Sequence, residues 1–153
     1  MSPDLERLIE LQRLDTIIAD ARARVAAHPA RLAEADGRLA AARQAVDAIK
    51  DRIKQNQEER RALEKDAAVY QGRLSKYKDQ LAAVKTNREY QAMQHEIAAA
   101  QQELGGAEEK VIAHMVASDS LGAELKAAEA ALAAQQKEVD QQKKALAAEL
   151  VEV

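Results

Sequence analysis

The sequence predicts an all-α fold, a long antiparallel coiled-coil hairpin with a kinked N-terminal helix, forming a single domain over residues 1–153. Three observations predict this fold. The chain is rich in Ala, Glu, Lys, Leu, Arg and Gln and has three Tyr but no Trp or Phe, a composition typical of long helices. Apolar residues recur with a 3.5-residue period through two long stretches. A helix-start pattern stands between those stretches.

The first predicted helix covers residues 3–27. Ser2 suits the N-cap, and Pro3 suits the first helical position, where its missing N–H would have no helical partner. Aliphatic side chains recur every three or four residues and line one face, which Ile9 and Ile17 widen. The face consists of Leu5, Leu8, Leu11, Leu14, Ile18, Ala21 and Val25. His28 and Pro29 then predict either a kink or a short break, because proline removes an N–H and clashes with the preceding turn.

Two unbroken heptad series over residues 30–84 predict the first arm of the hairpin. They are Leu32, Leu39, Val46, Ile53, Arg60, Ala67, Leu74 and Leu81, and, three residues further on, Ala35, Ala42, Ile49, Asn56, Leu63, Tyr70, Tyr77 and Val84. A 3.5-residue period sustained over eight heptads specifies a left-handed supercoil.

The tip of the hairpin is predicted at residues 85–88. Thr86-Asn87-Arg88-Glu89 has the form T-x-x-E of a capping box, so a new helix should begin near Thr86 or Asn87. The second arm is predicted over residues 88–150. Its two series are Tyr90, Ile97, Leu104, Val111, Ser118, Leu125, Leu132, Val139, Leu146 and Val153, and Met93, Ala100, Ala107, His114, Leu121, Ala128, Gln135, Gln142 and Glu149.

Antiparallel pairing about this tip brings residues together when their numbers sum to about 174. The register places large residues against small ones, for example Leu132 against Ala42. It also aligns polar residues as a layer that fixes the register, with Arg60 beside His114 and Asn56 beside Ser118. The alternative is that Arg60 and His114 only extend outward to solvent.

The three tyrosines, Tyr70, Tyr77 and Tyr90, occupy predicted seam positions in the tip half. Their rings are expected to fill the core with their hydroxyls at its edge. An exposed aromatic platform for stacking bases is the alternative.

Charge differs between the arms. Residues 50–90 carry 11 basic and 7 acidic side chains, whereas residues 91–153 carry 5 basic and 11 acidic ones. Attraction between the two arms along their flanks accounts for this difference. A strip that binds nucleic acid is the alternative. The strip would consist of Lys50, Arg52, Lys54, Arg61, Lys65, Arg73, Lys76, Lys78, Lys85 and Arg88.

Catalytic patterns are missing from the sequence. There is no Gly-rich phosphate loop, and His95-Glu96 lacks the second His of an HExxH pattern. A two-helix hairpin also offers no deep cleft, so we expect no enzyme. Without Cys there is no disulfide or thiolate metal site, and we expect no cofactor. Neither a signal peptide nor a membrane span is evident, which favours a cytoplasmic protein that does not bind a membrane.

The tip segment VKTNREYQAMQHEI, residues 84–97, resembles the most recognisable motif of a bacterial family of coiled-coil proteins with a C-terminal four-cysteine zinc ribbon. The opening LIELQRLDTIIADAR and the following proline are similar to the start of the same family. The resemblance covers nearly the whole chain. By the motif match, the residues that carry over to partner binding are Lys85, Thr86, Asn87, Glu89, Tyr90, Ala92, Glu96 and Ile97. The ribbon itself is absent, so zinc is expected only if a ribbon follows residue 153.

The resemblance implies a non-enzymatic adaptor or chaperone. Some members of this family serve sigma-54 and the flagellar or type III export apparatus, and RNA binding has been attributed to one. A sigma factor or an export component is therefore the expected protein partner, and RNA is the alternative. The aliphatic stripe of residues 5–18 has no partner under the register, so we expect self-association through it, fraying, or a fold-back at Pro29. A continuation of the second arm would cover it in a longer chain.

Overall fold

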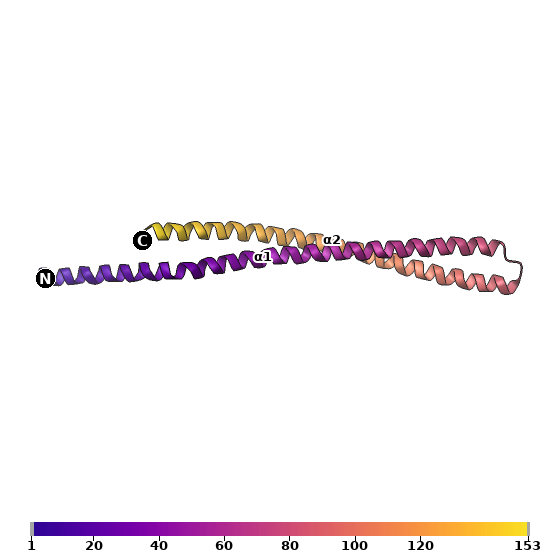
Figure 1. Cartoon of the computed structure of the whole chain (residues 1–153), viewed down its shortest axis with the longest axis horizontal. Coiled ribbons are helices and arrows are strands. Elements are labelled where there is room, and N and C mark those ends of the chain that lie inside the picture. The colour runs from indigo at the N-terminus through magenta and orange to yellow at the C-terminus, as the bar shows by residue number, and fades with distance from the viewer. Residues whose placement is uncertain (1, 153) are drawn as a thin grey trace. The chain divides into compact units, whose positions relative to one another are not determined.

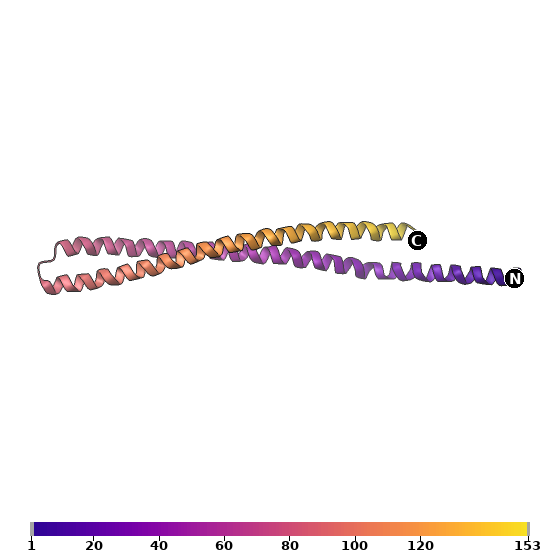
Figure 2. The same ribbon diagram turned by 180° about the vertical axis from the view of Figure 1, so that it is seen from behind.

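Two long helices account for almost all of the residues that the computed structural model describes, residues 2–152. Helix α1 spans Pro3–Ala82 and helix α2 spans Asn87–Glu152. The chain reverses direction between them, as the two opposite views in Figure 1 and Figure 2 show. The helices pack against each other and the described residues contain no strand, so the fold is an all-α helical hairpin, as predicted.

Helix α1 continues through Pro29, so the predicted alternative of a short break is wrong. Residues 3–27 and 30–84 therefore do not form separate helices. Pro29 leaves the carbonyl of Val25 without its helical donor. Val25 is 41% exposed, so this turn is accessible to water that can take the place of the missing N–H. The long helical stretches on both sides then outweigh a cost of about 3 kcal/mol for proline inside a helix.

The turn lies slightly earlier than predicted. Helix α1 ends at Ala82 rather than residue 84, α2 begins at Asn87 rather than residue 88, and α2 runs to Glu152 rather than residue 150. The backbone N–H of Glu89 donates to the Thr86 hydroxyl at 3.2 Å, so Thr86 is the N-cap, as its position predicts. The described hydrogen bonds do not include the reciprocal bond from the Glu89 carboxylate, so only half of the capping box forms.

The chain divides into two compact units, each with its own piece of the seam between α1 and α2. In the unit that comprises the chain up to Val46 and from Ala128 onward, Ala35, Leu39 and Val139 form a buried cluster. In the unit from Asp47 to Ala127, a second cluster closes the seam near the turn. It consists of Leu74, Ile97 and Ala100, packed by Tyr77, Leu81, Met93 and Leu104.

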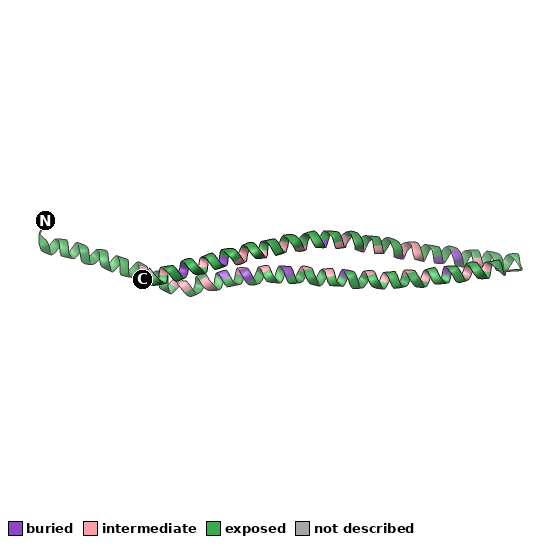
Figure 3. Ribbon diagram, turned by 90° about the horizontal axis from the view of Figure 1, so that it is seen from above, coloured by how far each residue is buried: buried purple, intermediate pink, exposed green. Residues whose placement is uncertain are grey.

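The predicted heptad positions account for this burial. Each of them is buried or half-buried except Tyr90, with Val153 outside the described residues. Figure 3 shows the buried positions along the facing sides of the two helices. Tyr77 packs into the seam and Tyr70 is half-buried, but Tyr90 is 47% exposed, so the expectation that it fills core is wrong. Tyr90 lies beside the turn, where the helices have only begun to pair.

The polar layer forms, but with a different partner. Asn56 is 9% exposed, and its Nδ2 donates to the backbone carbonyl of His114 at 2.9 Å. The His114 ring Nδ1 lies 2.6 Å from Asn56 Oδ1. Asn56 thus bonds one turn away from Ser118, because a helical carbonyl points toward the residue four positions further on. Arg60 Nε lies 3.5 Å from Glu64 on its own helix.

Neither described helix contains a stretch that is long and apolar enough to cross a lipid bilayer.

Candidate docking surface at the tip

The turn presents a continuous set of accessible side chains. Every residue from Lys85 to Ala92 is exposed. The Thr86 cap holds the start of α2, and the Tyr90 hydroxyl accepts a 3.0 Å hydrogen bond from Gln94 one turn further on. The tip therefore combines exposure with a defined backbone, which lowers the entropy cost of binding a partner.

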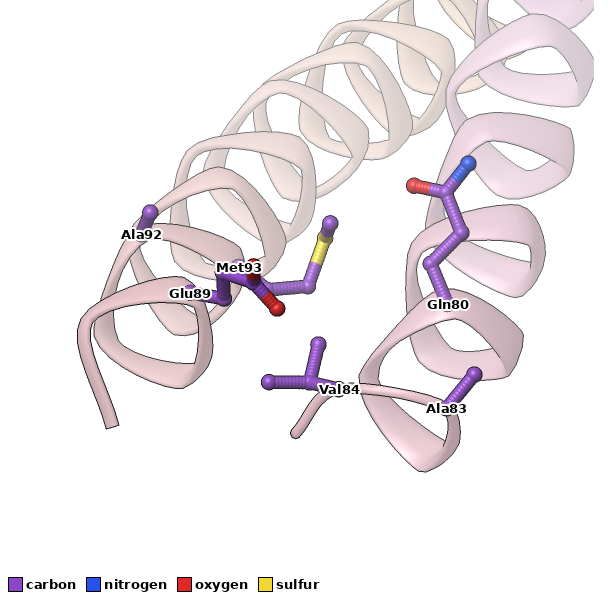
Figure 4. Close-up of a pocket in the computed structure, with 6 residues that line it drawn as sticks. All are labelled: Gln80, Ala83, Val84, Glu89, Ala92 and Met93. Atoms are coloured by element: carbon purple, nitrogen blue, oxygen red, sulfur yellow. The ribbon is translucent and has the colours of Figure 1, made fainter. Parts of the chain in front are cut away.

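A shallow hollow of about 410 Å³ opens between the end of α1 and the start of α2. Figure 4 shows the Met93 and Val84 side chains pointing into the space between the two helix ends. Its lining is completed by Gln80, Ala83, Glu89 and Ala92. Most of this lining is aliphatic, with one amide and one carboxylate at its margin. An apolar floor with a few polar groups suits a side chain of a protein partner.

The residues of the tip motif do not all face outward. Lys85, Thr86, Asn87, Glu89, Tyr90, Ala92 and Glu96 are exposed. Ile97 is only 6% exposed and packs with Leu74 and Ala100, so it belongs to the seam rather than to the accessible surface. Sequence reasoning missed Gln80 and Met93 as parts of the same hollow, because heptad spacing assigns Met93 to the core and gives Gln80 no role.

The basic residues proposed as a nucleic-acid strip are all exposed. Two of them face carboxylates across the seam: Arg52 Nη1 lies 3.1 Å from Glu124 Oε2, and Arg73 Nη1 lies 4.0 Å from Glu103 Oε2. The Arg73 guanidinium also lies 5.8 Å from the centroid of the Tyr70 ring. These contacts match the expected attraction between the arms, and they leave less positive charge directed at solvent.

The polar layer offers little for chemistry. His114 Nε2 lies 3.8 Å from Glu59 Oε2, and its other ring nitrogen is engaged by Asn56. Among the residues that the structure describes, no group of three or more His, Cys, Asp or Glu side chains could hold a metal ion. Asn56 and His114 are therefore packing and register residues in this geometry.

A second apolar patch lies on the outer side of α2 and was not anticipated from the sequence. Ile112, Met115 and Val116 are 60%, 51% and 64% exposed. Their i, i+3, i+4 spacing is a sequence pattern that could have revealed them. Beside them, a hollow of about 360 Å³ is lined by Glu64, Ala67, Glu108, Val111 and Ile112.

No protein-family model, no curated protein and no solved structure matches this chain. The class of protein is therefore defined by its fold, a helical hairpin with an exposed turn.

Proposed function

We propose that this chain is a non-enzymatic adaptor that binds a protein partner through its tip. The observation that carries the proposal is the hollow of about 410 Å³ at the turn, with Val84, Ala92 and Met93 supplying apolar surface. Glu89 at its margin supplies a charge that can select a basic or amide group of the partner. A partner helix with one projecting aliphatic or aromatic side chain has the chemistry that this surface would bind.

The resemblance of residues 84–97 to the tip motif of the zinc-ribbon coiled-coil family supports the same proposal. Seven of the eight residues carried over from that motif are exposed around the turn, where a partner could reach them. On this resemblance, the partner is a sigma factor or a component of an export apparatus, and the chain serves it as adaptor or chaperone.

A photo-cross-linking amino acid placed at position 90 tests the proposal. Val69 is the matched control position, because it is 52% exposed on the outer side of α1 and Tyr90 is 47% exposed. We expect a cross-link to one protein from position 90 in cells, and none from position 69. Equal cross-linking from both positions, or none from position 90, would contradict a tip-specific docking surface.

A pair of alanine substitutions locates the contact within the tip. Ala92→Arg places a long charged side chain at the lining of the hollow, whereas Ala99→Arg makes the same change one heptad further along an exposed side of α2. We expect Ala92→Arg to abolish the cross-link and Ala99→Arg to preserve it.

RNA binding through the ten basic residues is the competing function. Phosphate binding would weaken steeply with salt, with log affinity falling by about 0.7 per phosphate contact for each unit of log salt concentration. Cross-linking of nucleic acid from the Val69 side, with that salt dependence, would favour it over the adaptor.

A further inference from the structure

The first five turns of α1 carry large aliphatic side chains with nothing packed on them. Every residue from Ser2 to Asp20 is exposed, and Ala21 is the first that is half-buried. The exposed fractions of the large aliphatic residues are well above those in the seam. They are Leu5 46%, Leu8 52%, Ile9 50%, Leu11 58%, Leu14 44%, Ile17 52% and Ile18 47%. Contiguous apolar surface of this extent is characteristic of an interaction site.

We propose that this segment, residues 3–21, pairs antiparallel with the same segment of a second copy of the chain. In the pairing, residues meet when their numbers sum to about 25. Leu11 of each copy then packs on Leu14 of the other, and Leu8 on Ile17 of the other, so that four leucines form the centre of a two-fold symmetric seam. Such self-complementary pairing is what a two-fold symmetric dimer requires.

The length of the bare segment fits one such copy. Where α1 becomes covered, Arg24, Val25 and His28 line a small hollow together with Leu146, Glu149 and Leu150 of α2. A second copy in this register starts with its Pro3 opposite Arg22, just short of that contact. It therefore fills the uncovered length of α1 and displaces nothing from α2.

Charge selects the antiparallel direction. With numbers summing to about 25, Asp4 comes beside Arg22 of the second copy and Arg7 comes beside Asp15, so each neighbouring pair has opposite signs. A parallel, in-register dimer would instead place Asp4 on Asp4 and Arg7 on Arg7 at the seam. It would also bring Glu10 beside Asp15 of the other copy, again with like charges. Complementary charges favour the first arrangement and oppose the second.

Sedimentation equilibrium of the full chain tests whether the stripe is the interface. We expect a dimer that Leu14→Lys weakens by on the order of a hundredfold, because it removes two central side chains per dimer. Leu14 is exposed in the single chain, so this substitution leaves the hairpin folded, which circular dichroism will check. The control Thr16→Lys adds the same charge on the outer side of α1 and should leave the dimer intact. A monomeric wild-type chain at millimolar concentration, or an unaffected Leu14→Lys dimer, overturns the proposal.

Charge reversal tests the direction. Arg7→Glu and Asp15→Arg should each weaken the dimer by about fivefold to tenfold, because each replaces opposite charges by like ones at two places. An equimolar mixture of the two variants should regain wild-type affinity as a heterodimer, since both of its pairs have opposite signs again. In a parallel dimer, Asp15→Arg would strengthen association by pairing with Glu10, and that result would overturn the antiparallel arrangement.

Discussion

At the scale of single residues, Asn56 and His114 are the contact that departs from an otherwise apolar seam. Asn56 uses both ends of its amide, one toward the His114 ring and one toward the His114 carbonyl. The pairing satisfies groups that would be costly to bury alone, and it can form at one register only. Sequence reasoning found both residues from the polar gaps in the heptads. It missed their direct contact because residue numbers give the level of a side chain and not the direction of a backbone carbonyl.

Asn56→Ala should lower the free energy of unfolding by about 1–3 kcal/mol, because it leaves the His114 ring and carbonyl without their partner. Replacing both residues, Asn56→Leu with His114→Leu, should recover most of this loss by restoring an apolar layer. Denaturant unfolding measures both effects. The exposed neighbour Gln55→Ala is the control and should change stability by less than about 0.5 kcal/mol. A double variant as unstable as Asn56→Ala would mean that the layer does more than satisfy its own polar groups.

The cap of α2 is a second contact of residue scale. Thr86→Ala should cost about 1 kcal/mol, because it removes the acceptor of the Glu89 N–H. Thr86→Ser keeps the hydroxyl and should remain close to the wild-type midpoint in thermal unfolding. Glu89→Ala should cost less, about 0.3–1 kcal/mol, since the described bonds leave it only its favourable position in the first turn of α2. Equal losses for Thr86→Ala and Thr86→Ser would show that the cap does not hold the turn.

At the scale of the helices, burial in the seam outweighs the ion pairs on its flanks. The heptad pattern predicted which positions are covered, because a 3.5-residue period reflects the geometry of helix pairing directly. Pro29 could not be predicted in the same way. A single proline opposes a helix locally, but the outcome depends on the length of helix on each side and on whether water reaches the freed carbonyl.

Leu74→Ala should lower the free energy of unfolding by about 2–5 kcal/mol, because Leu74 is 5% exposed within its cluster. Arg52→Ala, which removes an ion pair whose side chains are 60% and 47% exposed, should cost less than about 1 kcal/mol. Urea unfolding of the two variants gives the comparison. A loss for Arg52→Ala as large as that for Leu74→Ala would show that charge pairing dominates the seam.

The glycines of α2 leave stability unused. A Cβ built on Gly105 or Gly106 would meet nothing within 4 Å, and both residues lie inside a helix. Gly105→Ala and Gly106→Ala should each raise the free energy of unfolding by about 0.5–1 kcal/mol. The reverse change at the buried neighbour, Ala107→Gly, should lower it. Thermal unfolding will separate the three variants, and a loss of stability in the two alanine variants would point to a bend that needs these glycines.

For the whole molecule, order is unequal along α1. Residues 3–20 are exposed throughout, whereas each compact unit has a buried cluster of its own. A helix segment without packed side chains is marginal in water, because most helical stability in proteins comes from tertiary packing. The sequence predicted this imbalance through the missing partners of residues 5–18. It could not predict the tip hollow, which depends on how far the two helices separate at the turn.

Hydrogen exchange should follow this division. At concentrations where the chain is a monomer, amides of residues 5–18 should exchange at least about a hundredfold faster than those around Leu74 and Ile97. Mass spectrometry of the exchanged chain measures both regions in one experiment. Raising the concentration should protect residues 5–18 and leave the others unchanged. Uniform protection at every concentration would mean that the segment is stable without packing.

The position of the turn also bears on how the chain closes as it folds. Contacts across the seam join residues 58 apart in sequence at Asn56 and His114, and 104 apart at Arg38 and Gln142. Chain entropy makes the wider of these two contacts about 0.5 kcal/mol harder to form from an open chain. Once the layers near Leu81 and Met93 are in place, each further layer adds only one more turn. Folding should therefore proceed as a zipper from the Thr86 turn outward, with contact order falling as the hairpin closes.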